Sequence, residues 1–308
     1  MFKLKELELF AQDGKKIHTY IWDDVKEVKG ILQLVHGSCE HSKRYNDFAK
    51  FLNDNHWIVI SNDHRGHGKT ADLEKQELGY FADENGWKIL VDDLFLINNY
   101  IKKNYSNKKI VMLGHSMGSF LARSYAIDYG ETIEGLVLSG TAWESKLSLK
   151  FGVRVAKSRQ KKFGAKNIDQ FIWNLSYKKF NKKFNKEGNT GSEWLSIDKD
   201  NVRKFIEDPL CGQVFTTSAF KDLFEGLLYI QNKKSISNMR KDLPIILVSG
   251  SNDPVGQYGK KVIKTYKKFK KAKLKVGLKI YENLRHEILF DIDKELVAQD
   301  TLKFLNAI

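Results

Sequence analysis

The stretch IVMLGHSMGS (110–119) places a serine between two glycines directly after an apolar run. The run predicts a buried strand, and the residues from the serine to about Tyr129 predict a helix. A sharp turn between a strand and a helix strains the central residue and exposes its side chain above the sheet. Gly114 and Gly118 leave room for such a turn because they lack a side chain. Ser116 is therefore a candidate nucleophile, although composition alone occasionally produces this five-residue box.

Short apolar runs bounded by turn residues recur along the chain and alternate with segments of helical period. Apolar residues between Trp87 and Ile101, for example, recur at spacings of three and four, which predicts an amphipathic helix. The alternation predicts an α/β fold, with about eight mostly parallel strands and helices on both faces of the sheet. The expected strands are Lys3–Phe10, Ile17–Trp22, Ile31–Val35, Trp57–Ser61, Ile110–Leu113, Gly135–Leu138, Ile245–Ser249 and Leu278–Tyr281.

The alternation stops at about Ala142 and resumes after Ile236, with the strand-like run that follows Pro244. The intervening segment is basic and aromatic. We therefore expect one α/β core, formed by residues 1–141 and 237–308, and a mainly helical lid inserted at residues 142–236. An independent second domain is the alternative, but the return to the earlier rhythm favours an insertion.

Composition describes a globular protein with an uneven positive charge. The 308 residues are 42% hydrophobic and 29% charged, with a net charge of +14. Thirteen Lys or Arg face one acid in residues 146–186, and residues 260–275 hold nine lysines and no acid. No apolar stretch reads as a signal peptide or a membrane span. Cys39 and Cys211 suit neither a disulfide framework nor a zinc pattern, so we expect a cytoplasmic protein.

A serine hydroxyl needs a base within hydrogen-bond reach, and the base is usually oriented by a carboxylate. In a strand-turn-helix setting the expected chain order is serine, acid, histidine. Of the eight histidines only His286 follows Ser116, and it lies just beyond the last expected strand. Asp253 follows the preceding strand and is the candidate acid, although a turn-forming role is an equal alternative for that residue alone.

Acyl transfer also creates an oxyanion, which needs preorganised N–H donors. The backbone of Met117, directly after the candidate nucleophile, is one expected donor. The loop after an early strand supplies the other in this setting. His36-Gly37-Ser38 follows Ile31–Val35, so the Ser38 amide is the second candidate.

The chain resembles the monoacylglycerol lipase and lysophospholipase branch of the serine α/β-hydrolases. The matching segments are LVHGSCEHSKRY (34–45), NDHRGHGKT (62–70), GYFADENGW (79–87), LGHSMGS (113–119), DPLCG (208–212), SGSNDPVG (249–256) and YENLRHEIL (281–289). The resemblance implies the α/β-hydrolase fold, a triad of Ser116, Asp253 and His286, and oxyanion donors at Ser38 and Met117.

The same resemblance implies a lid between the sixth and seventh core strands, and hydrolysis of a single-chain lipid ester without metal or organic cofactor. Glu40, His41 and Arg44 match residues that brace the family's oxyanion loop. Cys39 departs from the family pattern, which generally has a second glycine there. A side chain at this position is expected to narrow the loop or shift its backbone.

Several alternatives remain open. The same triad would also serve a hydrolase of short soluble esters or peptides, and a vestigial site would leave a lipid- or membrane-binding module. A metal site at His36, His41, His64 and His67 is disfavoured because glycines and Arg65 interleave them.

The lid suggests a membrane partner, although its aromatic residues would equally serve to pack it onto the core. Aromatic residues interleave with its basic residues, which is typical of a surface that contacts anionic lipid at the inner membrane face. These aromatic residues are Phe151, Phe163, Phe171, Trp173, Tyr177, Phe180 and Phe184. No nucleic-acid-binding motif is present, so no nucleic-acid partner is expected.

Overall fold

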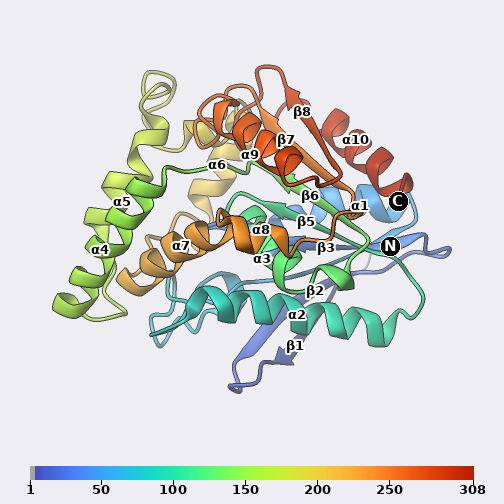
Figure 1. Ribbon diagram of the computed structural model, residues 1–308, viewed down its shortest axis with the longest axis horizontal. Coiled ribbons are helices and arrows are strands. Elements are labelled where there is room, and N and C mark those ends of the chain that lie inside the picture. The colour runs from blue at the N-terminus through green and yellow to red at the C-terminus, as the bar shows by residue number, and fades with distance from the viewer. Residues whose placement is uncertain (1–3) are drawn as a thin grey trace.

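The computed structural model describes residues 4–308 and contains one eight-stranded sheet (Figure 1). The strand order is β1-β2-β4-β3-β5-β6-β7-β8, and β2 alone runs against the others. The strands are β1 (Leu4–Phe10), β2 (Lys16–Trp22), β3 (Gly30–Val35), β4 (Trp57–Asn62), β5 (Ile110–His115), β6 (Gly135–Ser139), β7 (Ile245–Gly250) and β8 (Val276–Tyr281). The predicted mostly parallel sheet is confirmed; Lys3, expected in the first strand, lies outside the described residues.

Helices cover both faces of the sheet. Helices α2 (Gly86–Asn104), α3 (Met117–Asp128) and α9 (Lys260–Lys271) pack on one face, and α1 (Asn46–Asp54) and α10 (Lys294–Asn306) pack on the other. The central strands β3, β4, β5 and β6 are buried along their whole length, because parallel strands covered on both faces see no solvent. Helix α2 turns its apolar stripe, including Leu90 and Leu94, onto the sheet as its periodicity predicts.

The segment between β6 and β7, residues 140–244, carries five more helices and is called here the inserted segment. Its helices are α4 (Lys146–Phe163), α5 (Gln170–Ser176), α6 (Lys199–Glu207), α7 (Thr217–Ile230) and α8 (Lys233–Ser237). Figure 1 shows α4 and α5 at one side of the molecule, away from the sheet. Helix α4 packs on α7, and α7 packs on α2 and α3. Close approach to α2 requires Gly226, where an added Cβ would lie 2.1 Å from the Trp87 ring.

Short 3₁₀ turns complete the secondary structure: η1 (Ser42–Tyr45), η2 (Gly68–Thr70), η3 (Gly130–Thr132), η4 (Lys178–Asn181) and η5 (Glu193–Leu195). Within residues 4–308, no helix combines the length and the apolar character that crossing a bilayer requires.

Candidate active site

Ser116 lies at the sharp turn between β5 and α3 and has φ 51° and ψ −119°. The helix begins at Met117, one residue later than expected, because Ser116 itself is held outside helical geometry. Such a conformation costs about 1–3 kcal/mol and persists only where the surroundings enforce it. An added Cβ at Gly118 would lie 2.1 Å from the Val35 carbonyl oxygen, and one at Gly114 would lie 2.3 Å from that of Gly118. Both glycines are therefore required by close backbone approach.

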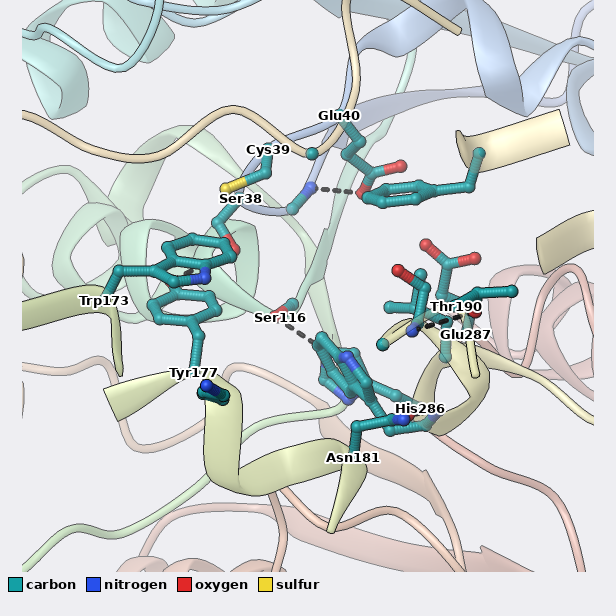
Figure 2. A pocket seen from close by; sticks show the side chains of 18 of the residues that line it. Ser38, Cys39, Glu40, Ser116, Trp173, Tyr177, Asn181, Thr190, His286 and Glu287 are labelled. Carbon is teal, nitrogen blue, oxygen red and sulfur yellow. Dashed lines mark hydrogen bonds between the residues drawn. The ribbon is translucent and has the colours of Figure 1, made fainter. Parts of the chain in front are cut away.

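His286 and Asp253 lie beside Ser116, in the chain order that the sequence predicts. Nε2 of His286 is 2.8 Å from the Ser116 hydroxyl oxygen (Figure 2). On the other side of the ring, Nδ1 lies 3.0 Å from Asp253 Oδ1, an ion-pair distance, although the N–H does not point straight at this oxygen. The backbone amide of Val255 donates to Asp253 Oδ1 and so fixes the carboxylate. The three side chains form one continuous chain of polar contacts.

Burial and charge act in opposite directions on His286. Burial disfavours the imidazolium, but the nearby carboxylates of Asp253, Glu287 and Glu40, with Asp253 foremost, together outweigh burial and raise the pKa of His286 above its ordinary value. His115, whose ring centroid lies 4.8 Å away, is buried without such a partner, and burial lowers its pKa to about 3. His115 therefore stays neutral, and His286 is the ring that is set to accept a proton.

The backbone amides of Ser38 and Met117 share one property. Within residues 4–308, neither the Ser38 amide nor the Met117 amide donates to a protein acceptor. Cys39 has φ 60°, a left-handed conformation that glycine adopts freely, which explains why a glycine suits this position. The Cys39 carbonyl accepts a hydrogen bond from the Gly212 amide at 2.8 Å, and this bond helps to hold the strained loop.

A buried cluster of ion pairs holds the loop that follows β3. Arg44 donates to Glu40 Oε2 at 2.6 Å and to both oxygens of Glu287 at 2.7 and 2.8 Å. Glu40 in turn accepts the Gly37 amide at 2.6 Å, so the cluster connects the loop after β3 with the residue after His286. Against the effect of burial, Arg44 holds the pKa of Glu287 below its ordinary value, whereas burial raises the pKa of Glu40.

Sequence reasoning identified Glu40 and Arg44 but missed Glu287, whose position directly after His286 was the available signal. His41 does not join this cluster. Its Nε2 lies 2.9 Å from Asp208 Oδ2, so it ties the loop to the inserted segment instead.

Two cavities meet at Ser116. A polar cavity of about 470 Å³ is lined by Ser38, Cys39, His286 and amide side chains such as Asn181 (Figure 2). An apolar cavity of about 560 Å³ extends from Ser116 between the inserted helices and α3. Its apolar lining includes Met117, Phe120, Leu147, Leu149, Phe151, Val155, Ile172, Leu175, Leu223, Phe224, Leu227 and Val255. The sequence pattern did not reveal either cavity, because their walls come from helices distant in sequence.

The aromatic rings of the inserted segment divide into two groups. Trp173 and Tyr177 stack with ring centroids 4.3 Å apart and line the polar cavity (Figure 2), and the Tyr177 hydroxyl donates to Ser38 Oγ at 3.2 Å. Phe184 is buried. Phe151 and Phe171, in contrast, are 65% and 51% exposed. Part of the aromatic content therefore packs the segment, and part of it faces solvent.

The four histidines weighed as a metal site do not gather as a set. His36, His64 and His67 pack against one another in tilted and edge-to-face arrangements, with ring centroids 3.9–6.0 Å apart, while His41 lies with Asp208 and Cys211. In the part of the chain that the structure describes, His41, Asp208 and Cys211 are the group whose ligand atoms lie within 4.8 Å of one another. Two of these three side chains already bond to each other.

The chain is similar in sequence and structure to several known proteins. A family model described as "Serine aminopeptidase, S33" matches residues 26–293. The monoglyceride lipase homolog of monkeypox virus is 24% identical over 293 residues, which cover 93% of this chain and 92% of the viral protein. The rat monoglyceride lipase is 25% identical over 245 residues, 80% of this chain and 72% of that protein. A thermostable carboxyl esterase from Bacillus coagulans, solved with glycerol, superposes with a TM-score of 0.92 at 27% identity, covering 100% and 99% of the two chains.

Proposed function

The chain belongs to the Hydrolase_4 family of serine α/β-hydrolases, described as serine aminopeptidase S33, and we propose that it hydrolyses the ester of a single-chain lipid. The expected substrate is a monoacylglycerol or a lysophospholipid. The apolar cavity that opens at Ser116 carries this proposal, because about 560 Å³ lined by aliphatic and aromatic side chains suits an acyl chain. Distant relatives named monoglyceride lipase support it. The polar cavity on the other side of Ser116 would hold the glycerol or phosphate headgroup.

The geometry supports acyl transfer in two steps. Ser116 attacks the ester carbonyl while His286 takes the hydroxyl proton, and Asp253 stabilises the resulting imidazolium. The Ser38 and Met117 amides receive the oxyanion, and one such donor is worth ~3 kcal/mol of barrier. His286 then protonates the leaving alcohol. Water, activated by the same base, then hydrolyses the acyl-serine. Each step of this proposed reaction uses only the substrate, water and groups of this chain.

We further propose that residues 142–236 act as a lid over this site. Helices α4, α5 and α7 form the walls of the apolar cavity, whereas Ser116, Asp253 and His286 come from the core. Movement of these helices would therefore open the acyl cavity without disturbing the reacting groups.

The exposed rim of the apolar cavity supports contact with an anionic membrane. Leu147, Phe151 and Leu175, which also line this cavity, are 81%, 65% and 56% exposed, and exposed lysines of α4 accompany them. Exposed apolar side chains among lysines are typical of a helix that rests in a lipid headgroup layer. The wild-type protein should sediment with phosphatidylglycerol vesicles at low salt. Equal sedimentation of a Leu147→Ser/Phe151→Ser variant would contradict this contact.

A hydrolysis panel tests the function. Monoacylglycerol and lysophosphatidylcholine are compared with p-nitrophenyl esters of increasing chain length, and we expect a long-chain optimum. Ser116→Ala should abolish turnover without lowering the melting temperature. A short-chain optimum, or cleavage of amino-terminal peptide substrates, would favour a soluble ester or peptide hydrolase. Failure of Ser116 to react with a fluorophosphonate probe would favour a binding module with an inactive site.

A further inference from the structure

Arg123 is a fully buried arginine in α3, two helical turns after Ser116. Within residues 4–308 it forms no ion pair with a carboxylate, and its Nε has no hydrogen-bond partner. Burial lowers the pKa of its guanidinium to about 9. A buried cation without a counter-charge is energetically costly, so the contacts that hold Arg123 in this position need an explanation.

Those contacts join the start of the inserted segment to the end of α7. Nη1 of Arg123 donates to the Ala142 carbonyl at 2.9 Å and lies 3.4 Å from the Thr141 hydroxyl, just after β6 ends. Nη2 donates to the Ile230 carbonyl at 3.3 Å, at the last residue of α7. The carbonyls at the end of a helix have no partner within it, and a cation there is favourable. One side chain of α3 therefore donates to the Ala142 carbonyl, at the start of the inserted segment, and to the Ile230 carbonyl, at the end of α7.

Two aromatic rings hold the guanidinium in place. Its central carbon lies 5.6 Å from the Trp143 ring centroid and 5.4 Å from that of Phe269 in α9. Trp143 belongs to the inserted segment and Phe269 belongs to the core. The cation is thus enclosed between the two parts that it connects.

The start of the inserted segment lies next to the reacting groups. The Ser139 carbonyl accepts the Ser116 amide at 2.9 Å, and an added Cβ at Gly140 would lie 2.9 Å from Cε1 of His286. Helix α3 also carries Met117 and Phe120, which line the apolar cavity opposite α4 and α7. A shift of the inserted helices relative to α3 would therefore change the width of this cavity.

We propose that Arg123 is a positioning residue that fixes the start of the inserted segment and the end of α7 to α3 and thereby sets the width of the apolar cavity above Ser116. It acts through the helices and touches no reacting atom. The effect on acyl chains rests on the proposed function, whereas the effect on the helices themselves does not.

The principal test uses Arg123→Met, which keeps an unbranched apolar stem but removes the guanidinium and with it every donor. Because it also removes an unpaired buried charge, the melting temperature should stay within about 5 °C of wild type. We expect kcat/KM for p-nitrophenyl laurate to fall about tenfold, mainly through KM, as the loss of a charged hydrogen bond predicts. Turnover of p-nitrophenyl butyrate should change by less than about threefold, since a short chain does not need the full cavity.

Two further variants and a second readout separate positioning from folding. Arg123→Lys offers a compact ammonium in place of the forked guanidinium, so an intermediate chain-length profile is expected. Arg240→Met is the matched control: Arg240 donates to the carbonyls of Gly130 and Ile133, at the opposite end of β6, and its loss should leave the profile unchanged. Hydrogen exchange should accelerate in α4 and α7 of Arg123→Met alone.

Unchanged exchange in α4 and α7 of Arg123→Met, or an equal loss of activity on both esters, would overturn the role of Arg123. If the wild-type protein does not hydrolyse p-nitrophenyl laurate, that result would instead contradict the lipid-ester proposal. Faster exchange in α4 and α7 of Arg123→Met would support the positioning role even then.

Discussion

Arg44 provides a quantitative test of how the oxyanion loop is held. Arg44→Met removes the guanidinium shared by Glu40 and Glu287, while the Met side chain can still pack between the rings of Phe205 and Phe290, 5.0 and 4.7 Å from the guanidinium carbon. Both carboxylates are 2% exposed, so the variant strands two buried negative charges. Breaking a buried ion pair by removing one partner costs about 3–5 kcal/mol, and we expect a loss of this size in the free energy of unfolding at pH 8.

The loss should depend on pH in a definite direction. Without Arg44, burial raises the pKa of the stranded carboxyls above the value of about 4.3 for an unfolded glutamate. The folded variant then binds more protons than the unfolded chain, so its stability falls as pH rises from about 4.3 through the raised pKa. Each pH unit in that interval changes the free energy of unfolding by about 1.4 kcal/mol for each carboxyl. The variant should therefore be closer to wild type at pH 5 than at pH 8.

Urea denaturation at pH 5 and pH 8 measures both effects. Adding Glu287→Gln to Arg44→Met removes one stranded charge and should recover part of the stability at pH 8. Arg203→Met is the control: its pairs with Asp200 and Glu207 lie at the surface and are worth at most about 1 kcal/mol. A loss for Arg44→Met below about 1 kcal/mol, or one that is the same at both pH values, would refute the argument.

Three other predictions concern the turn and the base. Gly118→Ala places a Cβ 2.1 Å from the Val35 carbonyl oxygen and should lower kcat/KM for p-nitrophenyl butyrate by more than about tenfold. Gly130→Ala is the control and should leave kcat/KM unchanged, because no atom lies within 4 Å of the added Cβ. Comparable losses in both variants would contradict the steric explanation. Because the pKa of His286 is raised and catalysis needs the neutral ring, kcat/KM should fall with decreasing pH through a midpoint above about 6.5. Asp253→Asn should cut kcat roughly 10⁴-fold and move this midpoint to lower pH, and an unmoved midpoint would show that Asp253 does not control the base.

The sequence predicted the core of this protein because local patterns are enough to specify it. Short apolar runs and a period of 3–4 residues predict buried strands and amphipathic helices wherever they occur in the chain. The serine box is only partly local: an added Cβ at Gly114 would meet Gly118 in the same turn, whereas one at Gly118 would meet Val35 at the end of the neighbouring strand β3. Elimination then identified His286 as the candidate base, and chain order suggested Asp253. The structure places both beside Ser116.

Only the tertiary structure decided which distant residues face one another. Glu287 pairs with Arg44 across 243 positions, and Arg123 bonds to carbonyls that no sequence pattern marks, because backbone acceptors are present at every residue. A break in rhythm marks residues 142–236 in the sequence, but amphipathic periodicity says only that a helix has an apolar face and does not say what covers it. The packing of α4, α5 and α7 around Ser116 determines whether those faces form a core, an open surface or a cavity for an acyl chain.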